Sequence, residues 1–247
     1  MKRVLQKANS FLKDLLLVSR IGILLTPFRL LFRFLLNFSL LSSWVNKYSG
    51  KVKFSDFYRP ARVYNDRIKL YEHIAQSEGL GAKPIHYLEF GVASGASFTW
   101  WANTNQHPES SFFGFDTFEG LPEDWHFYKK GDMGFNIPVM EDRRAGFFKG
   151  LFQDTLYDFL RAYQKRTDTA TATRVIHLDA DLYSSTLFAL TMLAPYLRKG
   201  DILFFDEFNV PNHEFAAWND FVRSFYIQYE VLGAVNNFYQ TSFKILK

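Results

Sequence analysis

From residue 84 to the end of the chain, short apolar runs alternate with longer stretches in which apolar residues recur at helical spacing. Glycine, proline or polar loops bound the runs, which is typical of strands buried in a parallel sheet. This alternation predicts an α/β protein with a doubly wound, mostly parallel sheet. The expected strands are residues 85–90, 111–116, 147–152, 174–179 and 201–207, followed by a hairpin of 229–235 and 238–246. The expected helices are residues 61–79, 96–104, 154–166, 185–197 and 214–226.

The strand at 85–90 leads directly into a turn that contains two glycines and then into a helix. Gly91 and Gly95 remove side chains where the backbone must turn sharply or approach a ligand. Ser94 or Ser97 can cap the helix, whose free amides suit a carboxylate or a phosphate. Strand, turn and helix together indicate the nucleotide-type crevice of an open α/β sheet. The glycine spacing differs from that of dinucleotide enzymes, and taken alone it also fits a tight turn without a ligand.

A second acidic residue ends the next expected strand. Asp116 lies 27 residues after Glu89, close to the interval of roughly 20 residues at which a ribose-binding acid follows such a glycine turn. We therefore expect the Asp116 carboxylate to accept hydrogen bonds from a ribose. The alternative for both acids is helix capping or pairing within a loop.

Three segments together resemble the macrocin O-methyltransferase family of class I methyltransferases: EFGVASGAS at 89–97, GFDTFEGLP at 114–122 and DADLYSST at 179–186. The resemblance covers residues 65–247 and implies S-adenosylmethionine (SAM) as the methyl donor. It also implies a seven-stranded Rossmann-like sheet whose last strand is antiparallel. In such an enzyme Glu89 would lie near the methionyl end of SAM. The SAM-binding residues expected on this basis are Glu89, Gly91, Gly95, Ser97, Asp116, Thr117, Phe118 and Gly120.

Further acids end the expected strands at 174–179 and 201–207. Asp179, Asp206 and Glu207 offer hard carboxylate oxygens from neighbouring strand ends, and such oxygens suit Mg²⁺. A hydroxyl acceptor needs a base or a metal ion, because it is a poor nucleophile until it loses a proton or binds a Lewis acid. In the family that the chain resembles, acids at these positions bind Mg²⁺, and the first is the proposed general base. The resemblance thus implies Asp179 as the catalytic residue, although Glu207 stands where Asp is typical.

Other polar residues near these motifs have simpler explanations. Asp181 either supports the site from behind or caps the following helix. His177, within an expected strand, is expected to be a core residue, and His213 an exposed cap of the helix at 214–226. Residues 117–145 combine proline and glycine with no periodicity, which favours a functional loop such as a lid.

Composition excludes some chemistry and divides the chain. The 247 residues include no cysteine, which excludes disulfides, thiolate metal sites and cysteine nucleophiles. Residues 1–53 carry ten Lys or Arg and one acid, whereas residues 54–247 carry 19 Lys or Arg and 24 acids. The acidic part argues against nucleic acid as a partner, and the basic part favours an anionic membrane or another polyanion. We expect a basic helical extension at 1–53 and a methyltransferase domain at 54–247.

The basic extension is also rich in Leu, Ile and Phe. Within residues 11–41 the longest uncharged run is eight residues, well short of the roughly 18 that a membrane-spanning helix needs. Pro27 predicts two helical pieces, near 4–25 and 28–42. The preferred prediction is a pair of helices on the membrane surface, so that a cytoplasmic protein contacts the inner face of the membrane. The alternative is a docking arm for a partner or for a second copy in a homodimer.

The leading functional hypothesis is a SAM- and Mg²⁺-dependent O-methyltransferase. Its acceptor would be a hydroxyl of a sugar-like, polyketide or lipid-linked molecule. A second hypothesis takes Asp179 and Asp181 as the Asp-x-Asp metal motif of a glycosyltransferase, but it leaves the glycine turn and Asp116 unexplained. A third treats the chain as a non-catalytic, membrane-tethered module on a methyltransferase fold.

Overall fold

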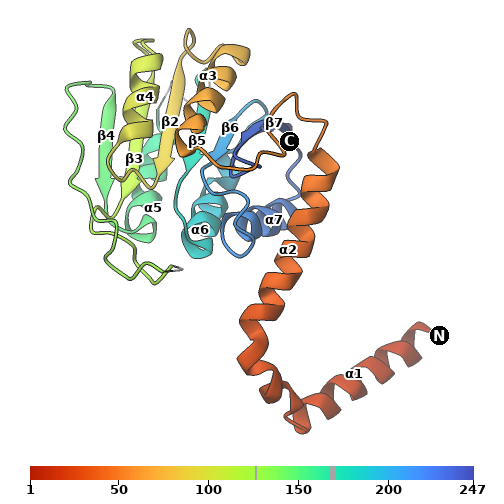
Figure 1. Ribbon diagram of the computed structural model, residues 1–247. Helices are drawn as coiled ribbons and strands as arrows, with labels where there is room; N and C mark the ends of the chain where they lie inside the picture. Colours follow the sequence, from red (N-terminus) through yellow and green to blue (C-terminus); the bar gives the residue numbers. More distant parts are fainter. Residues whose placement is uncertain (126, 167–170) are drawn as a thin grey trace.

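The computed structural model describes residues 1–125, 127–166 and 171–247. Its body is an eight-stranded sheet with helices on both faces, and its N-terminal residues form a helical arm that projects from this body (Figure 1). The α/β class and the doubly wound, mostly parallel sheet predicted from the sequence are confirmed.

The strands are arranged in the order β1-β7-β8-β6-β5-β2-β3-β4. β8 is antiparallel to both of its neighbours, and all other pairs are parallel. From β2 the chain builds outward through β3 and β4, and then returns to the other side of β2 to form β5. Ligands bind at such a reversal, outside the carboxyl ends of the strands. The strands are β1 Phe54–Ser55, β2 Ile85–Phe90, β3 Ser111–Asp116, β4 Ala145–Lys149, β5 Thr173–Leu178, β6 Ile202–Phe205, β7 Tyr229–Val235 and β8 Gln240–Ile245.

An eighth strand extends the seven that the family resemblance implies. β1 pairs in parallel with β7 at the edge of the sheet, where Phe54 lies opposite Gly233. The Phe54 ring stacks on His73 with 4.1 Å between ring centroids, which holds β1 in place. A strand of two residues shows no alternation of polar and apolar positions, so the sequence contains no pattern that predicts it.

Helices bury the apolar side chains of both sheet faces. α3 (Arg67–Ser77) and α4 (Ala96–Thr104) pack on one face. α5 (Phe152–Tyr163), α6 (Tyr183–Leu193) and α7 (Glu214–Phe225) pack on the other. The first crossover helix, α4, has the predicted bounds because the glycine turn marks its start.

Several predicted boundaries differ from the structure by two to six residues. The sequence predicts the third strand at 147–152, whereas β4 ends at Lys149. Gly150 has a φ of +143° and turns the chain, so that Phe152 begins α5 two residues before the predicted start. The helix predicted from residue 61 begins only at Arg67, after a short 3-10 turn.

The N-terminal arm consists of α1 (Lys2–Val18), a 3-10 segment at Ile21–Phe28 and α2 (Arg29–Tyr48). The main break is at Arg20, whose φ is +55°, and Pro27 lies inside the 3-10 segment without separating two α-helices. The two predicted helical pieces are present and the second begins at Arg29, close to the predicted residue 28, but the first ends at Val18, seven residues before its predicted end. α2 also continues six residues past the predicted end at residue 42, because its last turns pack on the body.

The second half of α2 belongs to the packed body. Leu41 is buried, and Trp44 and Tyr48 contact the same apolar core as α7. Trp44 Nε1 donates a hydrogen bond to the Tyr229 hydroxyl at 2.8 Å. The predicted domain boundary between residues 53 and 54 remains a prediction. The core of the predicted methyltransferase domain nevertheless includes side chains of α2, which precedes that boundary.

The first part of the arm is open to solvent, with every residue from 1 to 36 exposed. Among the described residues, Ile21–Tyr48 is one helical stretch that is long and apolar enough, by length and composition, to cross a membrane. Its most apolar part has a mean hydropathy of 1.5. Arg29 and Arg33 divide this stretch into short uncharged runs, so the lengths of those runs do not identify it. The two arginines are nevertheless its only charged residues before Lys47.

Candidate active site

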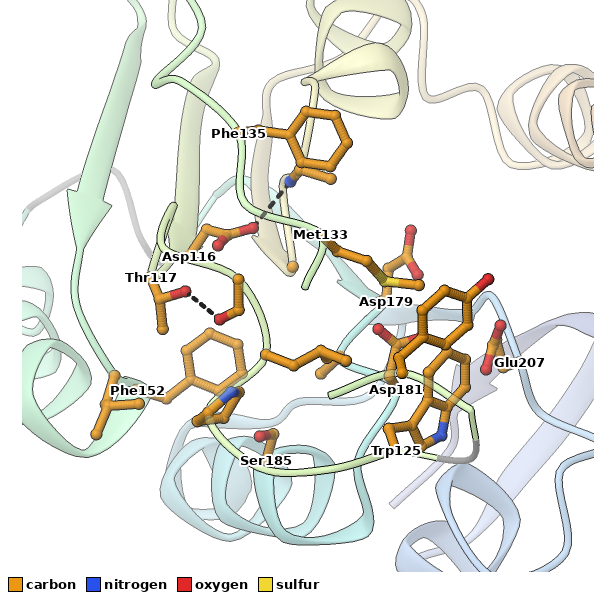
Figure 2. A pocket seen from close by; sticks show the side chains of 18 of the residues that line it. Asp116, Thr117, Trp125, Met133, Phe135, Phe152, Asp179, Asp181, Ser185 and Glu207 are labelled. Atoms are coloured by element: carbon orange, nitrogen blue, oxygen red, sulfur yellow. Dashed lines mark hydrogen bonds between the residues drawn. The ribbon is translucent and has the colours of Figure 1, made fainter. Parts of the chain in front are cut away.

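A cavity of about 440 Å³ lies at the carboxyl ends of β2, β3 and β5 (Figure 2). The glycine turn, the end of β3, the loop that follows it and the start of α6 form its walls. Its position is the reversal of strand order described above. The polar side chains that line it are Tyr64, Asp116, Thr117, Tyr128, Gln153, Asp179, Asp181, Ser185, Glu207 and Tyr239.

Gly91 allows the ends of β2 and β5 to approach each other beside the cavity. Its φ is +92°, in the left-handed region that favours glycine. A Cβ atom at this position would lie 1.8 Å from the backbone carbonyl oxygen of Asp179, so no side chain fits. The glycine turn therefore allows the end of β5 to pack closely against it, and it also directs the backbone N–H groups of Val92 and Ala93 toward Asp116.

Asp116 is hydrogen-bonded to the glycine turn. Its Oδ2 accepts from the backbone N–H groups of Val92 and Ala93, each at 2.8 Å, and its Oδ1 accepts from Phe118 N–H at 2.7 Å. These bonds are the pairing within a loop that was the alternative to ribose binding. Asp116 nevertheless lines the cavity, and a carboxylate has about four acceptor positions, so it can still accept from a ligand hydroxyl.

The loop between β3 and β4 folds over the cavity with its own hydrogen bonds. Leu121 N–H donates to the Asp132 carbonyl at 2.8 Å, and Gly131 N–H donates to the Leu121 carbonyl at 2.9 Å. Gly120 has a φ of +89°, and a Cβ atom there would lie 2.3 Å from the Asp132 carbonyl oxygen. Gly120 thus permits the tight return of this loop.

Aromatic and apolar side chains of the same loop face the cavity. Trp125 and Tyr128 stack with 5.6 Å between ring centroids and line it together with Met133 and Phe135 (Figure 2). One wall of the cavity is thus apolar, while the strand ends opposite supply carboxylates.

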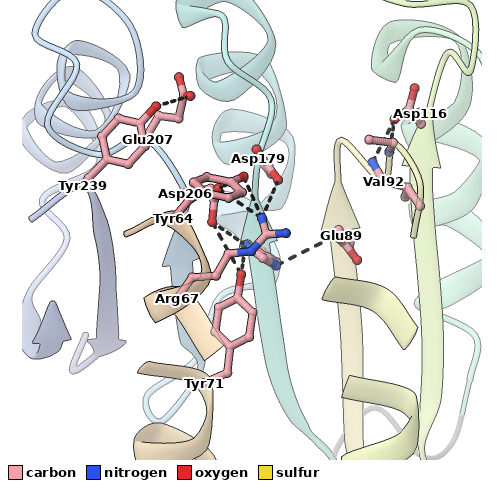
Figure 3. Close-up of polar contacts among 12 residues, drawn as sticks. Tyr64, Arg67, Tyr71, Glu89, Val92, Asp116, Asp179, Asp206, Glu207 and Tyr239 are labelled. Atoms are coloured by element: carbon pink, nitrogen blue, oxygen red, sulfur yellow. Dashed lines mark hydrogen bonds and ion pairs between the residues drawn. The ribbon is translucent and has the colours of Figure 1, made fainter. Parts of the chain in front are cut away.

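Asp206 is fully buried beneath the strand ends and does not line the cavity. Its Oδ2 accepts from the Tyr64 hydroxyl at 2.6 Å and from Arg67 Nη1 at 3.4 Å, and its Oδ1 accepts from the Tyr71 hydroxyl at 3.5 Å. The same Nη1 lies 4.0 Å from Asp179 Oδ2. Figure 3 shows the Arg67 guanidinium beside both carboxylates.

Asp181 and Glu207 form a carboxyl pair that lines the cavity. Burial raises the pKa of Asp181, and the neighbouring charges of Glu207 and Asp206 raise it further. Burial likewise raises the pKa of Glu207, while a hydrogen bond donated by the Tyr239 hydroxyl to Glu207 Oε1 lowers it. Two close carboxylates cannot both ionise easily, so the pair holds a shared proton more tightly than a solvated acid.

Comparison with known proteins supports the interpretation of this geometry. The family model of a methyltransferase domain matches residues 88–208. The solved structure of CalS11, a calicheamicin methyltransferase, is 20% identical, covers 73% of this chain and 77% of its own, and has a TM-score of 0.52. The O-methyltransferase NovP is 18% identical, covers 74% of this chain and 79% of its own, and has a TM-score of 0.53. No curated protein matches the chain by sequence.

Residues 88–208 match a methyltransferase domain, and the sheet that contains them has the fold of these two solved methyltransferases. The predicted fold and enzyme class, a methyltransferase, are confirmed at this level. The glycine turn and the strand-end acids that carried the resemblance all lie within or at the edge of the matched segment. The glycosyltransferase hypothesis loses its support, because the Asp-x-Asp pair belongs to the methyltransferase domain.

The cavity of the methyltransferase brings together only part of the predicted SAM site. Glu89 is buried, accepts a hydrogen bond from the Tyr87 hydroxyl at 3.1 Å, and has a pKa that burial raises well above its usual value. Gly95 is covered by Pro138, whose Cγ would lie 2.7 Å from a Cβ at that position. The predicted residues that line the cavity are Gly91, Asp116, Thr117 and Gly120. Those that do not are Glu89, Gly95, Ser97 and Phe118.

The three predicted magnesium ligands do not form a metal site in the methyltransferase. Among the described residues, no group of three His, Cys, Asp or Glu side chains is placed to hold a metal ion. Asp206 turns inward to Arg67, whereas Glu207 bonds to Tyr239 on the cavity side. The predicted set of Asp179, Asp206 and Glu207 therefore does not fit Mg²⁺, which needs near-octahedral oxygen ligands at about 2.0–2.1 Å.

The structure also settles the smaller predictions. His177 is a core residue, with Nδ1 2.8 Å from the Tyr87 hydroxyl, and burial lowers its pKa to about 4, so that it is neutral. His213 is the N-cap residue of α7, as predicted, but it is half-buried and its ring lies 6.4 Å from that of Trp125. Asp181 does not cap α6, whose N-cap residue is Leu182.

Sequence reasoning missed Tyr64, Arg67 and Tyr239. Tyr64 and Tyr239 line the cavity, and Arg67 lies between two acids beneath it. Tyr64 and Arg67 precede the first strand of the recognised motifs, and Tyr239 lies in the final hairpin. No spacing rule connects them to the acids, because only the folded sheet brings these segments together.

Proposed function

We propose that the chain is a SAM-dependent O-methyltransferase that acts on a hydroxyl of a small molecule. The observation that carries this proposal is the convergence of the glycine turn, Asp116 and Asp179 on one cavity within a class I methyltransferase domain. The cavity volume of about 440 Å³ lies within the range of roughly 300–1,000 Å³ that is usual for small-molecule sites.

The protein's part in methyl transfer is to hold the reactants and to take a proton. SAM, when bound, supplies a methyl group on a sulfonium that is already a good electrophile. Asp116 and the backbone near Gly91 would hold its ribose. Trp125, Met133 and Phe135 give the opposite side an apolar surface, and closing this surface over the reactants would strengthen the electrostatic effect of the acids.

Asp179 is the proposed base for the acceptor hydroxyl. Its carboxylate lines the cavity, and burial together with the charges of Asp206 and Asp181 raises its pKa, while Arg67 lowers it. A raised pKa makes a carboxylate a stronger base near neutral pH. Magnesium dependence is not part of this proposal, because the residues predicted for the metal do not form its site.

The proposed acceptor carries its hydroxyl on a sugar-like or polyketide framework, free or linked to a lipid. A cavity with an apolar aromatic wall and a polar floor suits such amphipathic molecules. The similar fold of a calicheamicin methyltransferase supports a small-molecule acceptor.

The Asp116→Ala substitution tests the SAM site. We expect wild-type protein to bind SAM and the variant to bind it more weakly by about 1–3 kcal/mol, because the ribose hydroxyls lose their acceptor. Titration calorimetry measures both, with Asp158→Ala on the exposed face of α5 as a control that keeps wild-type affinity. Equal affinities for wild type and Asp116→Ala would contradict the assignment, and binding of a UDP-sugar in place of SAM would favour the glycosyltransferase hypothesis.

The exposed part of the arm supports an anionic membrane surface as a partner. Residues 1–36 combine exposed Leu, Ile, Val and Phe side chains with basic ones and a single acid. The arm leaves the body beside the cavity, because Arg33 donates to the Asn212 carbonyl at 3.1 Å and lies over the ring of Tyr183, two residues before Ser185 of the cavity wall. Membrane contact by the arm would thus bring a lipid-linked acceptor near the cavity.

Flotation with liposomes tests this partner. We expect the full-length chain to float with anionic vesicles and to be partly released by high salt, since each basic residue adds about 1 kcal/mol and each buried apolar side chain about 1.5–3 kcal/mol. The triple variant Leu24→Asp, Leu30→Asp and Phe32→Asp should lose the salt-resistant part. Tyr157→Asp, at an exposed position of α5, is the control. The opposite outcome is a wild-type protein that does not bind vesicles, is a dimer in solution, and becomes monomeric in the triple variant. It would identify the exposed part of the arm as a docking arm instead.

A further inference from the structure

A basic side chain of the protein itself lies beside two of the acids that the sequence predicts as magnesium ligands. Arg67 Nη1 lies 3.4 Å from Asp206 Oδ2 and 4.0 Å from Asp179 Oδ2, which are two of the three predicted magnesium ligands (Figure 3). The Arg67 side chain is 14% exposed, so its charge is largely withdrawn from water. A cation in this position compensates the two carboxylates that would otherwise repel each other.

Arg67 is held there by several contacts. Nη1 donates to the Tyr64 hydroxyl at 2.7 Å, and the guanidinium carbon lies 4.3 Å from the centre of the Tyr64 ring. The Tyr64 hydroxyl in turn donates to Asp206. Arg67 is the first residue of α3, whose buried Leu70 and Tyr71 pack on the sheet. The position of the guanidinium is therefore set by the fold and by Tyr64 together.

The Asp206 carboxylate has little capacity left for a metal. It accepts from Tyr64, Arg67 and Tyr71, and its side chain is 1% exposed. A magnesium ion would have to displace the guanidinium and rotate Asp206 out of these hydrogen bonds. The third predicted ligand, Glu207, is bonded to Tyr239 and Asp181 on the cavity side.

We propose that Arg67 is the resident cation of this acid cluster and takes the place of a divalent metal ion. A guanidinium keeps its positive charge at any pH that the protein survives and forms directed hydrogen bonds to carboxylates. It neutralises Asp206 and lies within ion-pair distance of Asp179, so Arg67 acts as a positioning residue for the acid cluster. It also leaves the activation of the acceptor to Asp179 as a base, since it coordinates no oxygen as a Lewis acid would.

Magnesium binding tests this inference directly, and the test does not depend on methyl transfer. We expect calorimetric titration of the full-length wild-type protein with MgCl₂ to show no saturable binding, and its melting temperature to be the same with Mg²⁺ and with EDTA. Arg67→Met should melt at a lower temperature in EDTA, because the buried Asp206 and the neighbouring Asp179 lose their cation. Magnesium should restore part of that loss and bind at least about tenfold more tightly than to wild type.

Arg62→Met is the matched control. Arg62 lies nearby, with its guanidinium over the Tyr239 ring and a hydrogen bond to Asn209, but it bridges no pair of acids. This variant should gain no Mg²⁺ binding, and a gain equal to that of Arg67→Met would overturn the inference. Saturable Mg²⁺ binding by wild type would also overturn it, whether or not Arg67→Met folds. Loss of SAM binding, by contrast, would contradict the proposed function and leave the inference about Arg67 intact.

Discussion

Asp179→Asn is expected to remove at least about nine-tenths of the methyl transfer, a loss of about 1.4 kcal/mol or more in transition-state stabilisation. Asn has the shape of Asp but cannot take the proton of the acceptor hydroxyl. The Asp179 carboxylate lines the cavity, and its backbone lies directly against Gly91 of the glycine turn. Transfer of a labelled methyl group from SAM to a pool of hydroxylated acceptors measures this loss.

The variant should retain the wild-type melting temperature and SAM affinity, which separates a catalytic loss from unfolding. Wild-type turnover should rise with pH, because burial raises the pKa of Asp179 and only the ionised carboxylate is a base. Asp179→Asn should lose that rise. Asp158→Asn on the exposed face of α5 is the control, and a turnover in Asp179→Asn above about one tenth of wild type would show that Asp179 has no central part in catalysis.

The central strands could be predicted from the sequence because each is a buried apolar run with a defined end. β2 and β3 have the predicted bounds, Ile85–Phe90 and Ser111–Asp116. Both are completely or largely buried, so large apolar side chains dominate each run, and the run ends where the turn begins. The edge strand β4 is less buried, and its predicted position is two residues too late.

The arm could not be predicted as well, because its local pattern does not show which part packs. Its first 36 residues and residues 37–48 both mix large apolar side chains with polar ones. Only the second part meets the aromatic side chains around Tyr229 and Phe208, where Trp44 is held. Contacts between segments more than 150 residues apart leave no periodic signal in either one.

The candidate site shows the same division. The sequence predicts that Gly91 lies where the backbone turns sharply or approaches closely, and the structure agrees, because a Cβ atom there would meet the Asp179 carbonyl. The charge partners were not predicted, because Arg67 reaches Asp206 across 139 residues of sequence. Acids at strand ends thus predict that a cation is needed there, but the sequence leaves open whether it is a metal or an arginine.

Gly91→Ala is expected to destabilise the protein and abolish SAM binding together. The new Cβ would lie 1.8 Å from the Asp179 carbonyl oxygen and 2.7 Å from its carbonyl carbon, so the ends of β2 and β5 would have to separate. The φ of +92° adds strain of about 1–3 kcal/mol, and overpacking adds a further 1–3 kcal/mol or so. Thermal melting and SAM calorimetry measure the two effects.

Gly146→Ala in β4 is the matched control for Gly91→Ala. A Cβ atom at Gly146 meets nothing within 4 Å, and this glycine has no positive φ, so the same addition of one methyl group should leave stability and SAM affinity close to wild type. The contrast isolates the contact at Gly91 from the general effect of replacing glycine in the sheet. If Gly91→Ala melts and binds SAM as Gly146→Ala does, then β2 and β5 do not need to meet at this point. The glycine turn would then have to form the cavity in an arrangement different from the one described. The assignment of Asp116 and Asp179 to a single site would fail, because it depends on the described arrangement.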